Sequence, residues 1–230
     1  MKKIGIIFAL KEELEATLKK LTLKNEYKIF DLTFYECEKK DKECILVECG
    51  IGKVNAARCT QILIDNLEVD CILNIGVAGG VSKKVNICDV VIGDKLVQHD
   101  FDLRAFNHER GYIPNVGLYV NCDEYLIREA EKIKIDTNTH VGTIASGDIF
   151  VTELNMGEKI NSKFGALCVE MEGASIAQVC YLSNVPFLVI RSISDSPNKS
   201  ANNNITFDEF LEKSSNTVAK FVNKLIEKID

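Results

Sequence analysis

Apolar runs with strand character alternate with segments of helical periodicity along the chain, which is typical of a layered α/β domain. The expected strands are Lys3–Phe8, Lys28–Glu36, Glu43–Glu48, Cys71–Ile75, Asp89–Ile92, Lys95–Gln98, Thr143–Ser146, Ala166–Val169 and Pro186–Ile190. The expected helices are a first one in which Leu14, Leu18 and Leu21 repeat, then Lys53–Leu67, Asp123–Ile133, Gly173–Leu182 and one opened by a capping box at Thr206–Glu209. The pattern predicts one domain over residues 1–230.

Two glycine segments interrupt this pattern. Gly50–Gly52 lacks the glycine spacing and the hydroxyl of a P-loop, and Gly76–Gly80 does not form a dinucleotide fingerprint. Both are interpreted as tight turns, which serve either the fold alone or also the approach of a small ligand. The polar stretch Ser196–Asn204 is either a mobile lid or an ordinary connecting loop.

Composition narrows the class of protein. The 230 residues carry a net charge of −6, which argues against a nucleic-acid partner. No apolar run approaches the roughly 18 residues of a membrane span. Nine cysteines without a CxxC pair or an export signal indicate reduced thiols in the cytoplasm. The three histidines are scattered, so no metal site is expected.

Charged residues stand directly after or at the end of three apolar strands. Glu13 follows the first strand, Glu172 follows Val169, and Arg191 and Asp195 end the last one. Carboxylates beside buried strands are costly unless they are paired or used, so these positions predict a site for acid–base chemistry on a neutral or cationic substrate. The residues alone also allow Glu13 as a first-turn helix acid, and Arg191 with Asp195 as a structural ion pair.

The ordered combination of motifs resembles the 5′-methylthioadenosine/S-adenosylhomocysteine nucleosidases of the purine nucleoside phosphorylase and hydrolase superfamily. The matching stretches are Ile4–Glu13, Gly50–Ala57, Asn74–Gly80, His99–Phe106, Ser146–Phe150, Val169–Ala174, Arg191–Asp195 and Phe207–Phe210. The resemblance implies a three-layer α/β domain with a central mixed sheet. It also implies hydrolysis of the N-glycosidic bond of 5′-methylthioadenosine, S-adenosylhomocysteine and 5′-deoxyadenosine, with no metal or cofactor and with a homodimer as the working form.

The resemblance assigns catalytic roles to matching positions. Asp195 would protonate the leaving adenine at N7, with Ser194 orienting it, and Glu13 would hold and activate the water. Arg191 would orient that water or Glu13. Glu172 would accept hydrogen bonds from the ribose hydroxyls and stabilise the positive sugar in the transition state.

The resemblance also assigns the substrate-binding positions. Phe150 would stack on adenine, the Val151 backbone would bond the base edge, and Met171 would pack on the ribose. The remaining predicted contacts are Val77, Ala78 and Gly79 in the glycine segment, Leu10, Ile51 and Phe207 around the 5′-substituent, and Leu103, Phe106, His108 and Pro114 supplied by a second subunit. Leu10, Val77 and His108 depart from the residues usual in the family, which are a methionine, a serine and an aromatic.

Three alternative functions fit the sequence less well. A phosphorylase of the same fold needs an arginine and a serine for phosphate, and Asn74 and Val77 hold those places, so water is the predicted nucleophile. A catalytically silent nucleoside-binding module would not need the three carboxylates. A dinucleotide-binding oxidoreductase would need the missing fingerprint.

Overall fold

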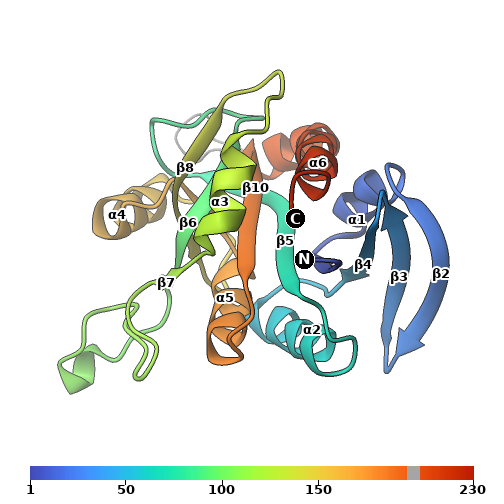
Figure 1. Cartoon of the computed structure of the whole chain (residues 1–230). Coiled ribbons are helices and arrows are strands. Elements are labelled where there is room, and N and C mark those ends of the chain that lie inside the picture. Colours follow the sequence, from blue (N-terminus) through green and yellow to red (C-terminus); the bar gives the residue numbers. More distant parts are fainter. Residues whose placement is uncertain (196–202) are drawn as a thin grey trace.

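The ten strands found in the described residues join into one mixed β-sheet (Figure 1). The computed structural model describes residues 1–195 and 203–230, with side chains in the second range described from residue 210 onward. The strands are β1 Lys3–Phe8, β2 Thr22–Ile29, β3 Leu32–Lys39, β4 Lys42–Glu48, β5 Cys71–Gly80, β6 Val90–Gln98, β7 Val120–Asn121, β8 Thr139–Ser146, β9 Cys168–Glu170 and β10 Phe187–Asp195. The order is β10-β6-β8-β9-β5-β1-β4-β3-β2, with β7 beside β6.

A further pairing between β10 and β5 closes part of this sheet on itself. Strands β10, β6, β8, β9 and β5 therefore form a ring of paired strands, from which β1 to β4 extend as an open sheet. Strands β1, β5 and β10 run parallel, so their carboxyl ends meet at one edge. In α/β sheets this edge is where ligands bind.

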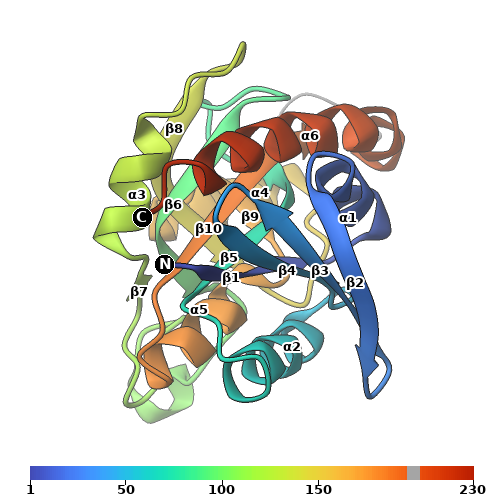
Figure 2. The same ribbon diagram turned by 45° about the vertical axis from the view of Figure 1, so that its right-hand side comes forward.

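Helices cover both faces of the sheet, which confirms the predicted three-layer α/β fold (Figure 2). They are α1 Lys11–Leu18, α2 Lys53–Asp65, the short 3-10 helix η1 Arg104–Phe106, α3 Glu124–Glu131, α4 Leu154–Phe164, α5 Gly173–Leu182 and α6 Asn203–Ile226. Helices α1 and α6 pack together on one face, and α2 and α5 pack together on the other. Within the described part of the chain, no helix has the length and apolar character needed to cross a membrane.

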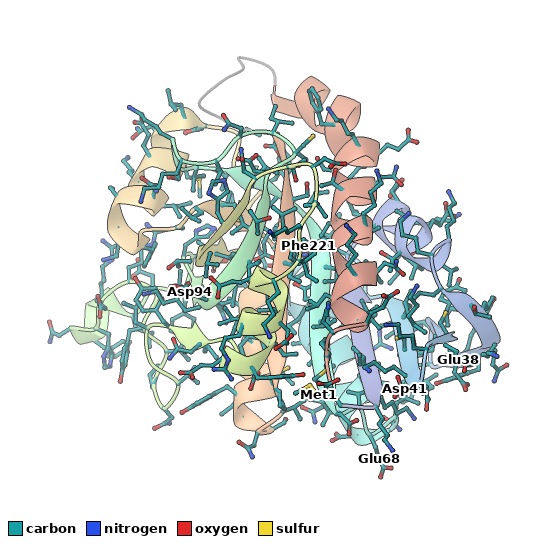
Figure 3. The ribbon with its side chains drawn as sticks, turned by 45° about the horizontal axis from the view of Figure 1, so that its top comes forward. Met1, Glu38, Asp41, Glu68, Asp94 and Phe221 are labelled. Atoms are coloured by element: carbon teal, nitrogen blue, oxygen red, sulfur yellow. The ribbon has the colours of Figure 1, made fainter. Side chains whose placement is uncertain are left out.

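The core lies between the central strands and these helices. From Ile4 to Phe8, β1 is buried on both faces, as expected for a parallel strand covered from two sides. Phe221 of α6 is fully buried against the sheet (Figure 3). The nine cysteines are free and buried, and desolvation raises the pKa of Cys37 to about 11 and that of Cys44 to about 12. These thiols act as small apolar groups in the core.

The structure corrects several predicted elements. The expected strand Lys28–Glu36 is wrong, because the chain reverses at Phe30, whose φ is +57°, between β2 and β3. The segment Gly76–Gly80 is not a turn, since it continues β5. The two strands expected over Asp89–Gln98 are one strand, β6, whose pairing with β8 shifts register between Gly93 and Leu96.

Other elements were missed or placed differently at their ends. Helix α4 and the short strand β7 were not expected. Strand β10 runs on to Asp195, and α6 begins at Asn203, before the expected capping box at Thr206–Glu209. The side chains of that capping box, and most of the Ser196–Asn204 stretch, lie outside what the structure describes.

Candidate active site

A cavity of about 430 Å³ opens at the carboxyl ends of β1, β5, β9 and β10. Its lining residues are Ala9, Leu10, Glu13, Ile51, Val77, Ala78, Gly79, Ile149, Phe150, Val151, Val169, Glu170, Met171, Glu172, Ser194 and Asp195. Twelve of the predicted site residues lie in this wall: Leu10, Glu13, Ile51, Val77, Ala78, Gly79, Phe150, Val151, Met171, Glu172, Ser194 and Asp195. Segments far apart in the sequence thus converge on one pocket.

Glu13 is held at the junction between β1 and α1. Its Oε2 accepts hydrogen bonds from the backbone N–H groups of Ala9 (3.1 Å) and Leu10 (3.0 Å), at the start of α1. Its Oε1 accepts one from the Val77 N–H at 2.8 Å. The carboxyl is only 2% exposed, and this desolvation raises its pKa, while the charge of Arg191 and the three N–H donors oppose the rise. Its neighbour Glu12 is exposed and does not line the cavity.

The helix-start role and the site position of Glu13 are compatible. A carboxylate at a helix N-terminus is stabilised by the unpaired N–H groups there. The same bonds fix the carboxyl group toward β5 and the cavity, so the alternative of a simple first-turn acid does not exclude a functional one.

Arg191 lies behind the cavity wall and is 1% exposed. Its Nη2 donates to Asn74 Oδ1 at 2.5 Å and to Glu170 Oε2, and it lies 3.8 Å from Glu172 Oε2. The guanidinium therefore neutralises a pair of buried carboxylates, a burial that would otherwise be costly. No hydrogen bond joins it to Glu13 among the described contacts, although its charge acts on that group.

Glu170 is the main site residue that the sequence analysis did not single out. Its Oε1 accepts from the Ser146 hydroxyl, and its Oε2 accepts from Arg191 and from the N–H groups of Glu172 (3.1 Å) and Gly173 (2.7 Å). With every oxygen engaged, Glu170 orders the turn that carries Glu172. The sequence signal was present, because Glu170 stands two residues before Glu172 at the end of the same strand.

Glu172 reaches across the cavity to the start of α2. Its Oε1 accepts a hydrogen bond from the Gly52 N–H at 2.8 Å. Burial raises its pKa, and the neighbouring Glu170 adds to the rise, whereas Arg191 opposes it. Glu172 is thus a buried carboxyl group, one oxygen of which is held by a backbone N–H.

Asp195 ends β10 opposite Gly79. It is 2% exposed, and its Oδ1 accepts a hydrogen bond from the Ser194 hydroxyl at 2.8 Å. Desolvation raises its pKa, and the Ser194 bond only partly offsets that rise. No ion pair joins Arg191 to Asp195 in the described structure, so the alternative of a structural pair between them is wrong. A carboxyl of this kind favours its protonated form and can donate a proton.

Gly76 and Gly79 of β5 must be glycine because other side chains approach their backbone closely. The sequence predicted this close approach, although not the strand in which it occurs. A Cβ at Gly76 would lie 2.6 Å from Glu13 Oε1 and closer still to Arg191 Nη1. A Cβ at Gly79 would lie 3.2 Å from Asp195 Oδ2. In the other glycine segment, Gly50 and Gly52 do have positive φ values, so the predicted turn there is confirmed.

Apolar side chains form the rest of the cavity. Leu10, Ile51 and Met171 line it together with Phe150 and Val151, and Ile51 is 55% exposed at its rim. Ile149, Ala9 and Val169 were not predicted. The pocket therefore combines a polar floor with an apolar, open mouth, as small-molecule sites commonly do.

The predicted contacts from a second subunit lie away from this cavity in their own chain. Leu103, Phe106, His108 and Pro114 belong to the segment between β6 and β7, which projects from the body in Figure 1. Phe106 is 72% exposed, and His108 stacks on Tyr112. The side chain of Phe207 lies outside the described residues.

Among the residues that the structure describes, no group of three or more His, Cys, Asp or Glu side chains is arranged to hold a metal ion. The polar groups at the cavity are the carboxyl groups, the Ser194 hydroxyl and backbone amides.

The fold and the site together define an α/β protein of the phosphorylase superfamily, whose family model matches residues 3–227. A 5′-methylthioadenosine/S-adenosylhomocysteine nucleosidase of Staphylococcus aureus is 38% identical over 229 residues, 98% of this chain and all of that protein. A crystal structure of the Helicobacter pylori nucleosidase, an aspartate-to-asparagine variant with 5′-methylthioadenosine in its active site, aligns with TM-score 0.95 at 38% identity over the full length of both chains. A structure of the futalosine hydrolase of Helicobacter pylori aligns with TM-score 0.93 at 38% identity, over 99% of this chain and 98% of that one.

The chain therefore belongs to the 5′-methylthioadenosine/S-adenosylhomocysteine nucleosidase family within that superfamily.

Proposed function

We propose that this protein hydrolyses the N-glycosidic bond of 5′-methylthioadenosine and S-adenosylhomocysteine, releasing adenine and the thioribose. 5′-Deoxyadenosine, which shares the adenine and the ribose, is proposed as a further substrate. Support comes from the full-length similarity to nucleosidases of this specificity and from the buried carboxyl groups around one cavity.

Departure of adenine is assigned to Asp195. A purine leaves more readily when N7 is protonated, and a carboxyl whose pKa is raised by burial holds the proton to be donated. Ser194 orients the carboxyl through its hydrogen bond to Oδ1, leaving Oδ2 for the base.

Attack on C1′ is assigned to a water held by Glu13. The Glu13 oxygens are anchored by three backbone N–H groups, so the carboxylate is positioned before substrate enters. Glu172 would face the ribose hydroxyls and stabilise the positive charge that develops on the sugar. In this assignment Arg191 acts indirectly, because it holds Glu170 and through it the Glu172 turn.

The charge of the cavity floor is the observation that favours water over phosphate. Four carboxyl groups, Glu13, Glu170, Glu172 and Asp195, line the cavity, and the only cation paired with them in the described structure is Arg191. That guanidinium is already shared among Glu170, Glu172 and Asn74. A phosphate dianion would meet the ionised carboxylates of this floor and no free cationic donor among the described lining residues.

We further propose that the protein works as a homodimer in the cytoplasm. The cavity mouth exposes Ile51, Ile149 and Phe150, and the projecting segment exposes Phe106. Covering both apolar surfaces with a second copy would complete the pocket around the 5′-substituent. Nine free, buried cysteines agree with a reducing compartment.

The test is adenine release from 5′-methylthioadenosine in phosphate-free buffer and in buffer with added phosphate. Equal release in both, with free thioribose as the second product, is the expected result. Release that requires phosphate, with thioribose 1-phosphate as product, would establish a phosphorylase. No release in either buffer would favour the silent nucleoside-binding module.

A further inference from the structure

Lys53, Asp100 and Asp148 form a closed ring of hydrogen bonds beside the cavity. The Lys53 ammonium donates to both oxygens of Asp100, at 2.7 and 2.9 Å. The Lys53 backbone N–H donates to Asp148 Oδ1 at 2.9 Å, and the Asp148 backbone N–H donates to Asp100 Oδ2 at 2.9 Å. Each of the three residues thus holds the other two.

The ring ties together the two loops that form the cavity rim. Lys53 begins α2, directly after the loop that carries Ile51 and the Gly52 N–H bound to Glu172. Asp148 precedes the rim residues 149–151, of which Phe150 is assigned to adenine. Asp100 lies just beyond β6 and belongs to neither loop. The ring therefore anchors both loops to the end of one strand.

The ring depends on the positive charge of Lys53, which lies between the two carboxylates. The side chains of Lys53 and Asp100 are only 18% and 16% exposed, so their ion pair is well shielded from water. Lys53 also lies 3.9 Å from Asp148 Oδ2 and donates to Gln98 Oε1 at 3.1 Å. Without the ammonium, Asp100 and Asp148 would be two adjacent carboxylates with no cation between them, and their repulsion would separate the loops.

We propose that Lys53 is a positioning residue, which clamps the 50–52 loop to the 147–151 loop and so sets the shape of the base and 5′-substituent pocket. This inference rests on the proposed function for its kinetic consequence. The catalytic carboxyl groups Glu13 and Asp195 lie on other elements. Glu172 contacts the clamped 50–52 loop through the Gly52 N–H, but the turn that carries it is ordered separately by Glu170. The clamp therefore acts on binding more than on turnover.

The first experiment compares Lys53→Met with the native enzyme in steady-state hydrolysis of 5′-methylthioadenosine. The expected result is a KM raised about tenfold with kcat changed less than about threefold, because two rim loops shift while the acid and the water site stay. An unchanged KM would overturn the proposal.

Lys39→Met is the matched control. Lys39 ends β3 and pairs with Glu227 at 3.0 Å, with side-chain exposure of 23%, close to that of Lys53. It belongs to the β3–β4 hairpin and does not line the cavity. Lys39→Met should leave KM unchanged, and an equal rise in KM in both variants would overturn the proposal by showing a general effect of losing an ion pair.

A double-mutant cycle tests the ring as a unit. Asp148 is 51% exposed, so the fold should tolerate Asp148→Ala, which removes the acceptor of the Lys53 N–H. The increase in KM caused by Lys53→Met and Asp148→Ala together should be well below the product of the two single increases. Independent, multiplicative increases would contradict a single clamp.

Amide hydrogen exchange separates this proposal from the proposed function. Lys53→Met should speed exchange in peptides that cover residues 50–53 and 147–151, whereas Lys39→Met should not. This measurement requires no turnover, so inactivity of the native protein on 5′-methylthioadenosine would refute the proposed function and leave the clamp to be decided by exchange. Unchanged exchange in the two loops would refute the clamp even in an active enzyme.

Discussion

Replacing Asp195 by asparagine should abolish turnover and, at neutral and higher pH, stabilise the folded protein. Asparagine has nearly the same shape and keeps an oxygen for the Ser194 hydroxyl, but it cannot deliver a proton. It also removes a titratable group whose pKa is raised by burial in the folded state.

The size of the stabilisation follows from proton linkage. A carboxyl with a raised folded-state pKa contributes stability that is fully present below its unfolded pKa of about 3.8 and is lost as pH rises through the folded pKa. Every tenfold difference in proton affinity between the folded and the unfolded chain corresponds to about 1.4 kcal/mol. For a chain of this length, 1 kcal/mol changes Tm by roughly 2–4 °C, so every such tenfold difference should raise the Tm of the variant by about 3–6 °C at high pH.

The assay is a series of thermal unfolding curves from pH 4 to pH 9 for both proteins, together with adenine release. The difference in Tm between variant and native protein should grow in favour of the variant as pH rises and then level off. Any constant cost of the unpaired amide group displaces the whole curve without changing this slope. A pH-independent difference, or full activity in Asp195→Asn, would refute the reasoning.

Three further predictions concern neighbouring parts of the site. Glu13→Gln should lower kcat by about 10²–10⁴-fold through loss of the base, and exposed Glu12→Gln should have little effect; the reverse ranking in steady-state assays would reassign the base. Gly76→Ala should cost about 1–3 kcal/mol in urea unfolding and most activity, because its Cβ would overlap Glu13 and Arg191; native stability would contradict the close contact. Ser194→Ala should raise the Asp195 pKa and move the alkaline limb of the kcat–pH profile to higher pH, and a move to lower pH would argue against this hydrogen bond.

Sequence patterns located elements best where burial is complete or strictly periodic. Strand β1 and helix α5 were predicted with their observed bounds, Lys3–Phe8 and Gly173–Leu182, because each contains an unbroken buried run, Ile4–Phe8 in β1 and residues 173–177 in α5. Strand β2, Thr22–Ile29, is largely exposed and is defined by pairing with β3, and the alternation of Leu23, Tyr27 and Ile29 with polar residues is interrupted at Asn25, where the pairing register shifts. Helix α4 was missed although the sequence contains a helical pattern there. Ile160 and Phe164 stand four residues apart, and Gly165 follows as a helix-ending residue.

The sequence predicted which residues line the candidate site, but not the contacts that they make with one another. Motif positions pointed to Glu13, Glu172 and Asp195, and all three line the cavity. The partner of Arg191 was not predictable, because Glu170 and Glu172 are equivalent acids by spacing and only the folded turn directs Glu170 to the guanidinium. The Lys53 ring was equally hidden, since its members are brought together by tertiary structure from positions up to 95 residues apart along the chain.

The burial of all nine cysteines makes the native chain suitable for site-specific labelling. A thiol-reactive fluorophore or spin label needs an accessible thiolate, and desolvation holds the pKa of Cys37, Cys44 and Cys71 at about 11 to 12, far above working pH. A single cysteine introduced at an exposed position beside the 147–151 loop would then be the preferred attachment point. The response of the cavity rim to a bound nucleoside could be measured without first removing any native thiol.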